Sequence, residues 1–320
     1  MKIRKIITTV FTALLFVTFA YAQDESPWTI SFTTDFAYYP KSDFIAGETH
    51  FSPVTGAYSG LEGRVTAAAK YTIPTPLGEH WLLNSATLDL TGKFELSPVS
   101  VKPAFDITWT PLPFIVFSAG AQIGTGWTLA GLQGMAELSA DGQKYDDLKP
   151  FGTFYTKYYG QGTFQFDTGA IVKGDWTHFQ IMYTYQVYYE QLTGIANQTV
   201  WEWQCTGNKV NGLKNYQNLV LAYQMPLVLS RVGVLTEFEG YFKDDAFANP
   251  NYNSTFNQIS ISPLGQFTFN DHNVLSVIFG FSSRRSFTTD HKEKIEETAL
   301  TYSGYEWFFN RIALSWTYTL

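Results

Sequence analysis

The 320-residue chain contains a single cysteine, Cys205, and no long apolar run after its first 22 residues. One cysteine forms neither an intramolecular disulfide nor a cysteine-based metal cluster. A membrane-spanning helix requires about 20 consecutive apolar residues, so we expect no such helix beyond the first segment. Basic clusters are also missing and the formal net charge is −7, which argues against nucleic-acid binding.

Motifs for catalysis and metal binding are equally scarce. The histidines at positions 50, 80, 178, 272 and 291 form neither an H-x-x-x-H nor an H-E-x-x-H pair, the spacings that place two imidazoles on one metal. A G-x-S-x-G nucleophile elbow does not occur either,. We therefore expect no enzyme activity, no metal and no cofactor.

The first segment has the form of a secretory signal peptide. Lys2, Arg4 and Lys5 precede an apolar core from Ile6 to Phe19, and Ala20-Tyr21-Ala22 supplies small residues at a cleavage site,. A transmembrane anchor is the alternative, but the apolar core is shorter than a membrane span. The sequence thus predicts a cleaved signal over residues 1–22 and a single domain over residues 23–320, which is still more acidic than the precursor.

What the sequence has in abundance is strict alternation of polar and apolar residues. In the segment from Arg311 to Leu320, Ile312, Leu314, Trp316, Tyr318 and Leu320 share one face. From Leu61 to Ile73, charged and small polar residues alternate with apolar ones for thirteen positions, longer than most strands of soluble sandwiches. One face suited to hydrocarbon and one suited to water are typical of a membrane-spanning β-barrel.

Twelve such segments can be placed between turn signals. They are Trp28–Tyr39, Leu61–Ile73, Thr87–Leu96, Val99–Trp109, Phe114–Gly124, Thr163–Val172, Trp176–Glu190, Tyr216–Met225, Arg231–Lys243, Thr255–Phe269, Val274–Arg285 and Gly304–Leu320. A turn at Pro263-Leu264, inside the tenth segment, is an alternative that the sequence leaves open. Short and long connections alternate, apart from a short link near Ser97-Pro98, as the periplasmic turns and extracellular loops of bacterial barrels do.

These features predict an all-β fold: a transmembrane antiparallel up-and-down β-barrel of about twelve strands, with 10 to 14 left open. Aromatic residues make up 18% of the chain and fall near the ends of the predicted strands, where amphipathic rings suit the water–lipid boundary. Closure follows because every backbone N–H and C=O in hydrocarbon needs a partner, and only a sheet without edges provides one.

The signal peptide, the alternation from Trp28 to Leu320 and the aromatic terminal strand together resemble the bacterial outer-membrane β-barrel proteins, the channel- and porin-like class at large. The resemblance implies a location in the bacterial outer membrane, contact with its lipid, and insertion by the outer-membrane insertion machinery. Most members end in Phe, whereas this chain ends in Leu320. Barrels of about twelve strands include solute channels, a phospholipase and autotransporter translocators. We expect a monomer.

Charged residues at inward positions are the candidate functional site. Charges in a spanning segment are costly unless they face water or each other, and they often mark a permeation path. The candidate pore-lining residues are Glu62, Arg64, Lys70, Asp89, Lys93, Lys102, Asp106, Asp167, Glu190, Glu237, Glu239 and Arg284. Two interpretations stay open: a narrow diffusion channel for small polar or charged solutes, or ion pairs that fill and brace the interior.

Two further features bear on the pore. The longest loop, Thr125–Gln161, carries Leu129, Leu132, Met135, Ala136 and Leu138 at roughly helical spacing, which suggests either a constriction in the mouth or a surface turn. Inward aromatics such as Tyr188, Tyr241, Tyr305 and Trp307 either stack on a solute or fill volume.

The favoured function is a diffusion channel. A non-conducting adhesin or structural barrel is the main alternative, and a lipid-modifying enzyme or a soluble periplasmic barrel is less favoured. His178 is followed by Phe179-Gln180, so the phospholipase pattern of a His two residues from a Ser is missing. We expect His178 to lie in the lumen or at its rim.

Overall fold

The computed structural model describes residues 26–80, 82–289 and 297–320, so the predicted signal peptide lies outside the described residues. Within those ranges, no helix is long and apolar enough to cross a membrane. Twelve long strands account for most of the chain: β1 (Trp28–Lys41), β3 (Gly56–Pro74), β4 (Thr87–Ser97), β5 (Ser100–Leu112), β6 (Ile115–Gly126), β11 (Tyr155–Asp167), β12 (His178–Leu192), β15 (Gly212–Gln224), β16 (Leu229–Tyr241), β17 (Gln258–Thr268), β18 (Asn273–Phe287) and β19 (Tyr302–Thr319).

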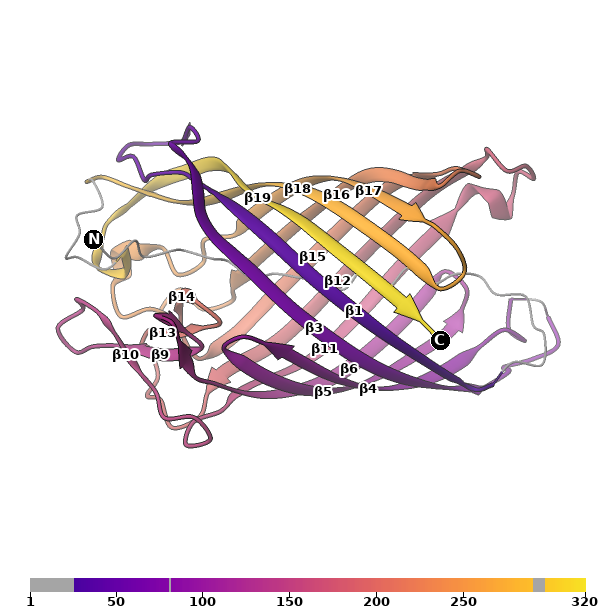
Figure 1. Cartoon of the computed structure of the whole chain (residues 1–320), viewed down its shortest axis with the longest axis horizontal. Helices are drawn as coiled ribbons and strands as arrows, with labels where there is room; N and C mark the ends of the chain where they lie inside the picture. Colours follow the sequence, from indigo (N-terminus) through magenta and orange to yellow (C-terminus); the bar gives the residue numbers. More distant parts are fainter. Residues whose placement is uncertain (1–25, 81, 290–296) are drawn as a thin grey trace.

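Each long strand pairs antiparallel with the next, and the sheet closes on itself (Figure 1). The closing seam joins β1 to β19, where Ser31 to Tyr38 pair with Thr319 to Ile312. The two-residue strand β2 (His50–Phe51) adds a parallel pairing on β19 beyond the seam. The predicted fold class, an antiparallel transmembrane-type barrel of twelve strands, is confirmed.

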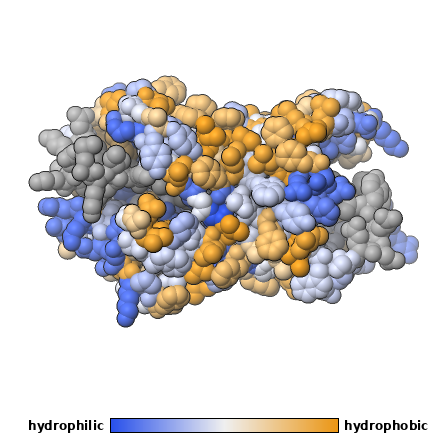
Figure 2. Space-filling model, in the orientation of Figure 1, coloured by the Kyte–Doolittle hydropathy of each residue, from blue (hydrophilic) through white to orange (hydrophobic). Residues whose placement is uncertain are grey.

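Apolar side chains cover the outside of the barrel, as the alternation predicted. On β12, Phe179, Ile181 and Tyr183 are exposed, whereas the residues between them are more buried. Figure 2 shows hydrophobic residues over much of the face between the two ends and hydrophilic ones gathered toward the ends. In water such a surface would be unfavourable, so this belt is built for lipid.

Most strand boundaries shift by a few residues from the prediction, and the sixth strand shifts the most. The sixth strand starts at Tyr155 instead of Thr163, and it ends at Asp167 instead of Val172. Asp167 stops the strand because its carboxylate accepts a hydrogen bond of 2.7 Å from the Gly169 amide and so caps the short 3-10 helix η1 (Thr168–Ala170). The tenth strand, by contrast, continues through Pro263, which pairs with Val234 on β16.

A β-bulge in β19 changes which side chains of this strand face the lumen. The pairing with β18 shifts between Gly280 and Phe281, opposite Asn310 and Arg311. A bulge inserts one residue and reverses which side chains face inward beyond it. Glu306 is consequently the fully buried residue, and the prediction that Tyr305 and Trp307 face the lumen was wrong.

The long loops build a second, smaller sheet over one end of the barrel. Strands β9 (Met135–Leu138), β10 (Tyr145–Asp147), β13 (Trp201–Trp203) and β14 (Thr206–Lys209) pair in the order β10-β9-β13-β14. We call this sheet the cap; Figure 1 shows it at the end away from the C-terminus.

The cap replaces the helical turn suggested by the apolar spacing of the longest loop. Strands β7 (Thr128–Leu129) and β8 (Leu132–Gln133) form a separate hairpin just before it. Both predicted placements are seen in part: Leu129 and Leu132 are exposed on the surface hairpin, whereas Met135 and Ala136 are buried in the cap. The cap is made of strands because β9 finds a partner in β13, which lies more than sixty residues away.

Candidate functional site: the barrel lumen

The predicted pore-lining charges are partnered. Lys70 lies 3.8 Å from Asp89, Lys93 lies 2.5 Å from Asp106, and the Glu62 carboxylate accepts a 2.7 Å hydrogen bond from Tyr39. The further contacts of the predicted set are Lys102 to Glu95, Asp167 to His178, Glu190 to Lys209 and Lys214, Glu237 to Tyr216, Glu239 to Lys214 and Tyr188, and Arg284 to Glu306. The structure therefore gives these charges partners in separate local pairs and clusters along the interior.

Arg64 is the centre of the largest cluster on the β1–β5 wall. Its Nε atom donates to Asp35 at 2.8 Å, and its Nη1 atom lies 3.8 Å from Glu95, which also pairs with Lys102 at 3.1 Å. Asp35 was not among the candidates, although its odd position in an alternating strand signals that it faces inward. Removing any one charge would leave its partners buried without compensation.

At the rim that carries the short turns, the lumen has a row of hydrogen bonds instead of ion clusters. His178 Nδ1 lies 3.0 Å from Asp167, and Gln180 bridges Asp167 at 2.9 Å to Gln224 at 2.8 Å. Arg231 Nη1 donates to Gln266 at 2.6 Å on the next strand. His178 thus lies at the inner rim, where the sequence placed it.

Exposure of the charged pairs falls along the axis of the barrel. The Lys70 and Asp89 side chains, near the short turns, are 40% and 20% exposed. Arg64 and Asp35, farther along, are 8% and 10% exposed, and Lys214 and Glu190, near the long loops, are 8% and 2% exposed. Among these pairs, the charges near the short turns are therefore more open to solvent than those near the long loops.

The cap explains this difference, because its tip reaches the barrel wall. At the turn between β13 and β14, Gln204 Nε2 donates to Ser100 Oγ at 2.7 Å and to Glu95 Oε1 at 3.0 Å. Farther round the wall, Lys209 of β14 lies 3.3 Å from Glu190 of β12. The cap therefore contacts the arc of the wall that runs from β4 and β5 to β12.

Apolar packing holds the cap in place. Met135, Trp201 and Trp203 of the cap pack with Tyr155 and Leu192 at the barrel mouth. The Trp203 ring lies directly on the β6 backbone, since a Cβ atom added at Gly124 would be 2.8 Å from it. Gly124 is thus a position where a side chain would push the cap away.

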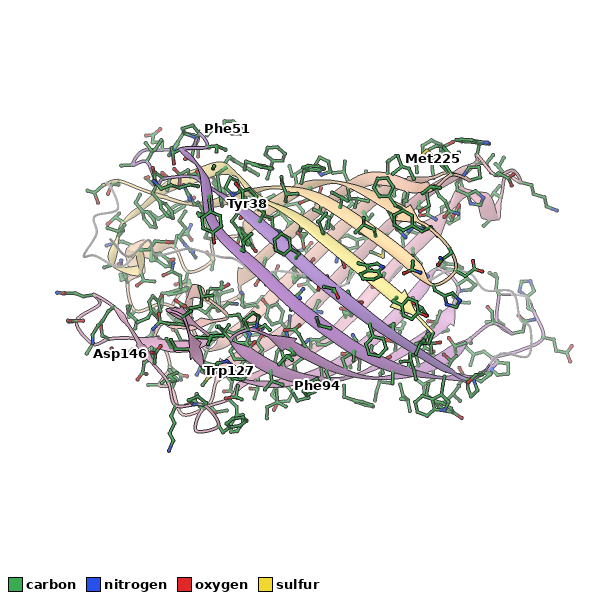
Figure 3. The ribbon with its side chains drawn as sticks, in the orientation of Figure 1. Tyr38, Phe51, Phe94, Trp127, Asp146 and Met225 are labelled. Atoms are coloured by element: carbon green, nitrogen blue, oxygen red, sulfur yellow. The ribbon has the colours of Figure 1, made fainter. Side chains whose placement is uncertain are left out.

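Neighbouring loops join the cap. Val200 and Val210 belong to a buried cluster with Phe247, Tyr252 and Leu300. The Tyr252 hydroxyl donates to Glu297 at 2.9 Å, and burial raises the pKa of this phenol well above its usual range. In Figure 3, Phe51, Trp127 and Asp146 lie at this end of the barrel, and Met225 lies at the other.

Tyr188 and Tyr241, two of the predicted inward aromatics, fill volume. Both are nearly buried. Lys157 and Lys214 lie over the Tyr188 ring at 3.8 Å and 5.5 Å, and Lys214 lies 4.9 Å from the Tyr241 centroid. These contacts brace the upper lumen and leave neither ring face open to a solute.

The loop after β1 makes a second, smaller closure, centred on Glu306. Arg284 donates to Glu306, whose other contacts are the Ile45 amide at 2.9 Å and His50 Nε2 at 3.3 Å. Glu306 was missed from the sequence because the bulge changes the parity of the strand. No group of three His, Cys, Asp or Glu side chains suited to a metal occurs in the described part of the chain.

No family model matches the chain, and no curated protein matches it significantly. Among solved structures it is similar to the β domain of the Bordetella autotransporter BrkA, with 6% identity and a TM-score of 0.40 over 91% of this chain and 98% of that one. It is also similar to the KdgM porin (8%, 0.36, 91% and 98%) and to Pseudomonas putida OprB (9%, 0.32, 92% and 94%). These similarities are too distant to bear on function.

The outer surface of the barrel indicates the environment in which the protein lies. A closed sheet has no unpaired backbone edge, and its outer face is an apolar belt, the two properties that a strand-built protein needs to cross a bilayer. The chain is a transmembrane β-barrel with the fold of outer-membrane proteins. Its cap lies at one end and its short turns at the other, and from the sequence we expect the short turns to be periplasmic.

Proposed function

We propose that this barrel is a narrow diffusion channel for small polar or charged solutes and that the structure is its closed state. The observation that carries the proposal is the fall in exposure from Lys70 to Glu190. A partly hydrated, charge-lined passage leads inward from the periplasm and ends at the cap.

The closure is made of loops and not of barrel strands. The cap contacts the lumenal charges through a neutral amide, Gln204, and a single lysine, Lys209. Hydrogen bonds of this kind exchange readily for bonds to water. Displacing the cap therefore leaves the twelve-stranded wall intact, because the barrel ladders do not run through it.

We propose that the paired charges have both of the roles considered from the sequence: some brace the wall, and others line a path for solutes. The inner pairs, such as Arg64 with Asp35, brace the wall. The half-exposed pair of Lys70 and Asp89 lines the hydrated entrance, where both signs of charge admit solutes of either sign. We further propose a monomer without catalytic activity or cofactor, inserted by the outer-membrane machinery and contacted by outer-membrane lipid.

Planar bilayer recordings test the proposal. Gly124→Val places a branched side chain where the Trp203 ring lies and should displace the cap. Gly160→Val is the matched control, because a Cβ atom at Gly160 meets nothing within 4 Å. We expect rare, brief conductance from wild type and from Gly160→Val, and frequent steps from Gly124→Val.

Absence of conductance from correctly folded Gly124→Val would contradict the channel and favour the non-conducting surface barrel. Folding is checked separately by heat-modifiable mobility on gels, which a closed barrel retains. This control separates a sealed barrel from a misfolded one.

A further inference from the structure

One level of the inner wall is apolar on six of the twelve strands, which the charge pattern did not predict. Ala37, Val220, Ala222, Leu235, Leu264, Ile278 and Ala313, which we call the apolar band, belong to one buried cluster that also includes Tyr39. They come from β1 and from β15 to β19, six adjacent strands of the closed sheet. None of the seven is more than 7% exposed.

The register shows that the band faces inward. Val220 pairs with Leu235, Leu264 with Ile278, and Ile278 with Ala313. Their chain neighbours Leu221, Val234, Phe279 and Leu314 are 49%, 38%, 44% and 38% exposed on the lipid face. Because successive side chains alternate between faces, the band belongs to the lumen.

Polar groups lie on both sides of the band. Toward the short turns, on the same strands, are Gln224, Arg231 and Gln266. Toward the cap is a cavity of about 10 Å³ lined by Glu237, Ser260 and Arg311 among others, enough for a single water. On these six strands, the band thus separates the polar groups near the short turns from those near the cap.

The cap tip touches the cluster to which the band belongs. Cys205, at the turn between β13 and β14, packs against this cluster together with Met182. Lifting the cap therefore uncovers part of the same cluster.

We propose that the apolar band is a second barrier in the same channel, a hydrophobic gate that opposes ions by excluding water. This inference rests on the proposed channel function. Apolar constrictions stop ion flow without filling the pore, because water leaves a narrow apolar passage. Once the cap is displaced, the polarity of the band then controls conductance.

The test adds band substitutions to the cap-displaced variant Gly124→Val. Leu235→Asn introduces a polar side chain of similar size, and Leu235→Met is the apolar match. Val220→Thr, which keeps the branched shape, is a second polar variant for the case in which Leu235→Asn does not fold. We expect Leu235→Asn or Val220→Thr to raise the unit conductance severalfold, and Leu235→Met to leave it unchanged.

Equal conductance in the polar and apolar variants would overturn the gate and leave the channel standing, since the band would then be packing alone. A rise with Leu235→Met equal to that with Leu235→Asn would also overturn it, because size and not polarity would be the cause. Silence in every folded variant would overturn the gate and the channel together.

Discussion

Gln204 of the cap donates a 3.0 Å hydrogen bond to Glu95 of the barrel wall, across 109 residues of sequence. Glu95 is in turn paired with Lys102 at 3.1 Å and lies 3.8 Å from Arg64. The loop that closes the mouth is thereby tied to the charge network that lines the lumen. We therefore expect a change in the cap to affect the charge network, and a change in the network to affect the cap.

Loss of this tie should loosen the cap tip. Gln204→Ala removes both hydrogen bonds, to Glu95 and to Ser100, and leaves a buried carboxylate with one donor fewer, at a cost of about 1–3 kcal/mol. Cys205 is the chain's single cysteine and follows directly in sequence, so its labelling by a maleimide reports the movement. We expect faster labelling in Gln204→Ala.

Gln198→Ala is the control for that experiment. Gln198 also donates one amide hydrogen bond, at 2.8 Å to the Asp245 carbonyl, but it lies on the exposed side of the loops. Labelling of Cys205 at the wild-type rate in Gln204→Ala would show that the tie does not hold the cap.

The core of the cap depends on Trp201. This side chain is fully buried, its Nε1 atom donates to Asn211 at 2.9 Å, and its ring contacts Tyr155 edge-on. Trp201→Ala should cost about 3–5 kcal/mol of local stability. We expect protease cleavage within the cap loops while the barrel keeps its heat-modifiable mobility. Trp176→Ala, at an exposed turn residue, should leave the cap resistant; equal cleavage in both variants would refute a cap-specific role.

Arg64 should matter for stability more than for selectivity. Arg64→Met leaves Asp35 without its buried cation, which typically costs about 3–5 kcal/mol. Arg64→Met/Asp35→Asn should recover part of this loss because the unpaired charge is removed. Urea unfolding of the refolded barrel in detergent measures both, and a midpoint unchanged in Arg64→Met would contradict the bracing role.

Lys70 should show the reverse behaviour. Its pair with Asp89 is long, 3.8 Å, and 40% exposed on the lysine side, so its loss costs under about 1 kcal/mol. Lys70→Glu in the Gly124→Val background should shift the reversal potential in a KCl gradient toward cation preference. An unshifted reversal potential would remove Lys70 from the conducting path.

Strand positions followed from the sequence because lipid and water impose a period of two on every spanning segment. All twelve strands were placed by this rule, and even Pro263 lies within one. The reach of the sixth strand was underestimated, since Tyr155 to Gly162 lies in a stretch whose glycines and tyrosines blur the alternation.

The contacts inside the barrel could not be predicted from the period of two alone. Pairing of Arg64 with Asp35 depends on register, and the parity change at Asn310 and Arg311 depends on a bulge that no local pattern marks. The cap was hidden for a third reason: β9 and β13 are stabilised by each other, and neither segment shows strong alternation alone. In the sequence, the apolar band could be seen only as a set of inward positions without charged residues.

The central claim is that the lumen opens to the periplasm and is sealed from the outside. Side-specific labelling tests it most directly, with Lys70→Cys in a Cys205→Ser background and an impermeant maleimide. Thr128→Cys, on an exposed loop strand, is the positive control in intact cells. The account predicts that Cys at position 70 reacts only after the outer membrane is permeabilised, whereas rapid labelling in intact cells would contradict it.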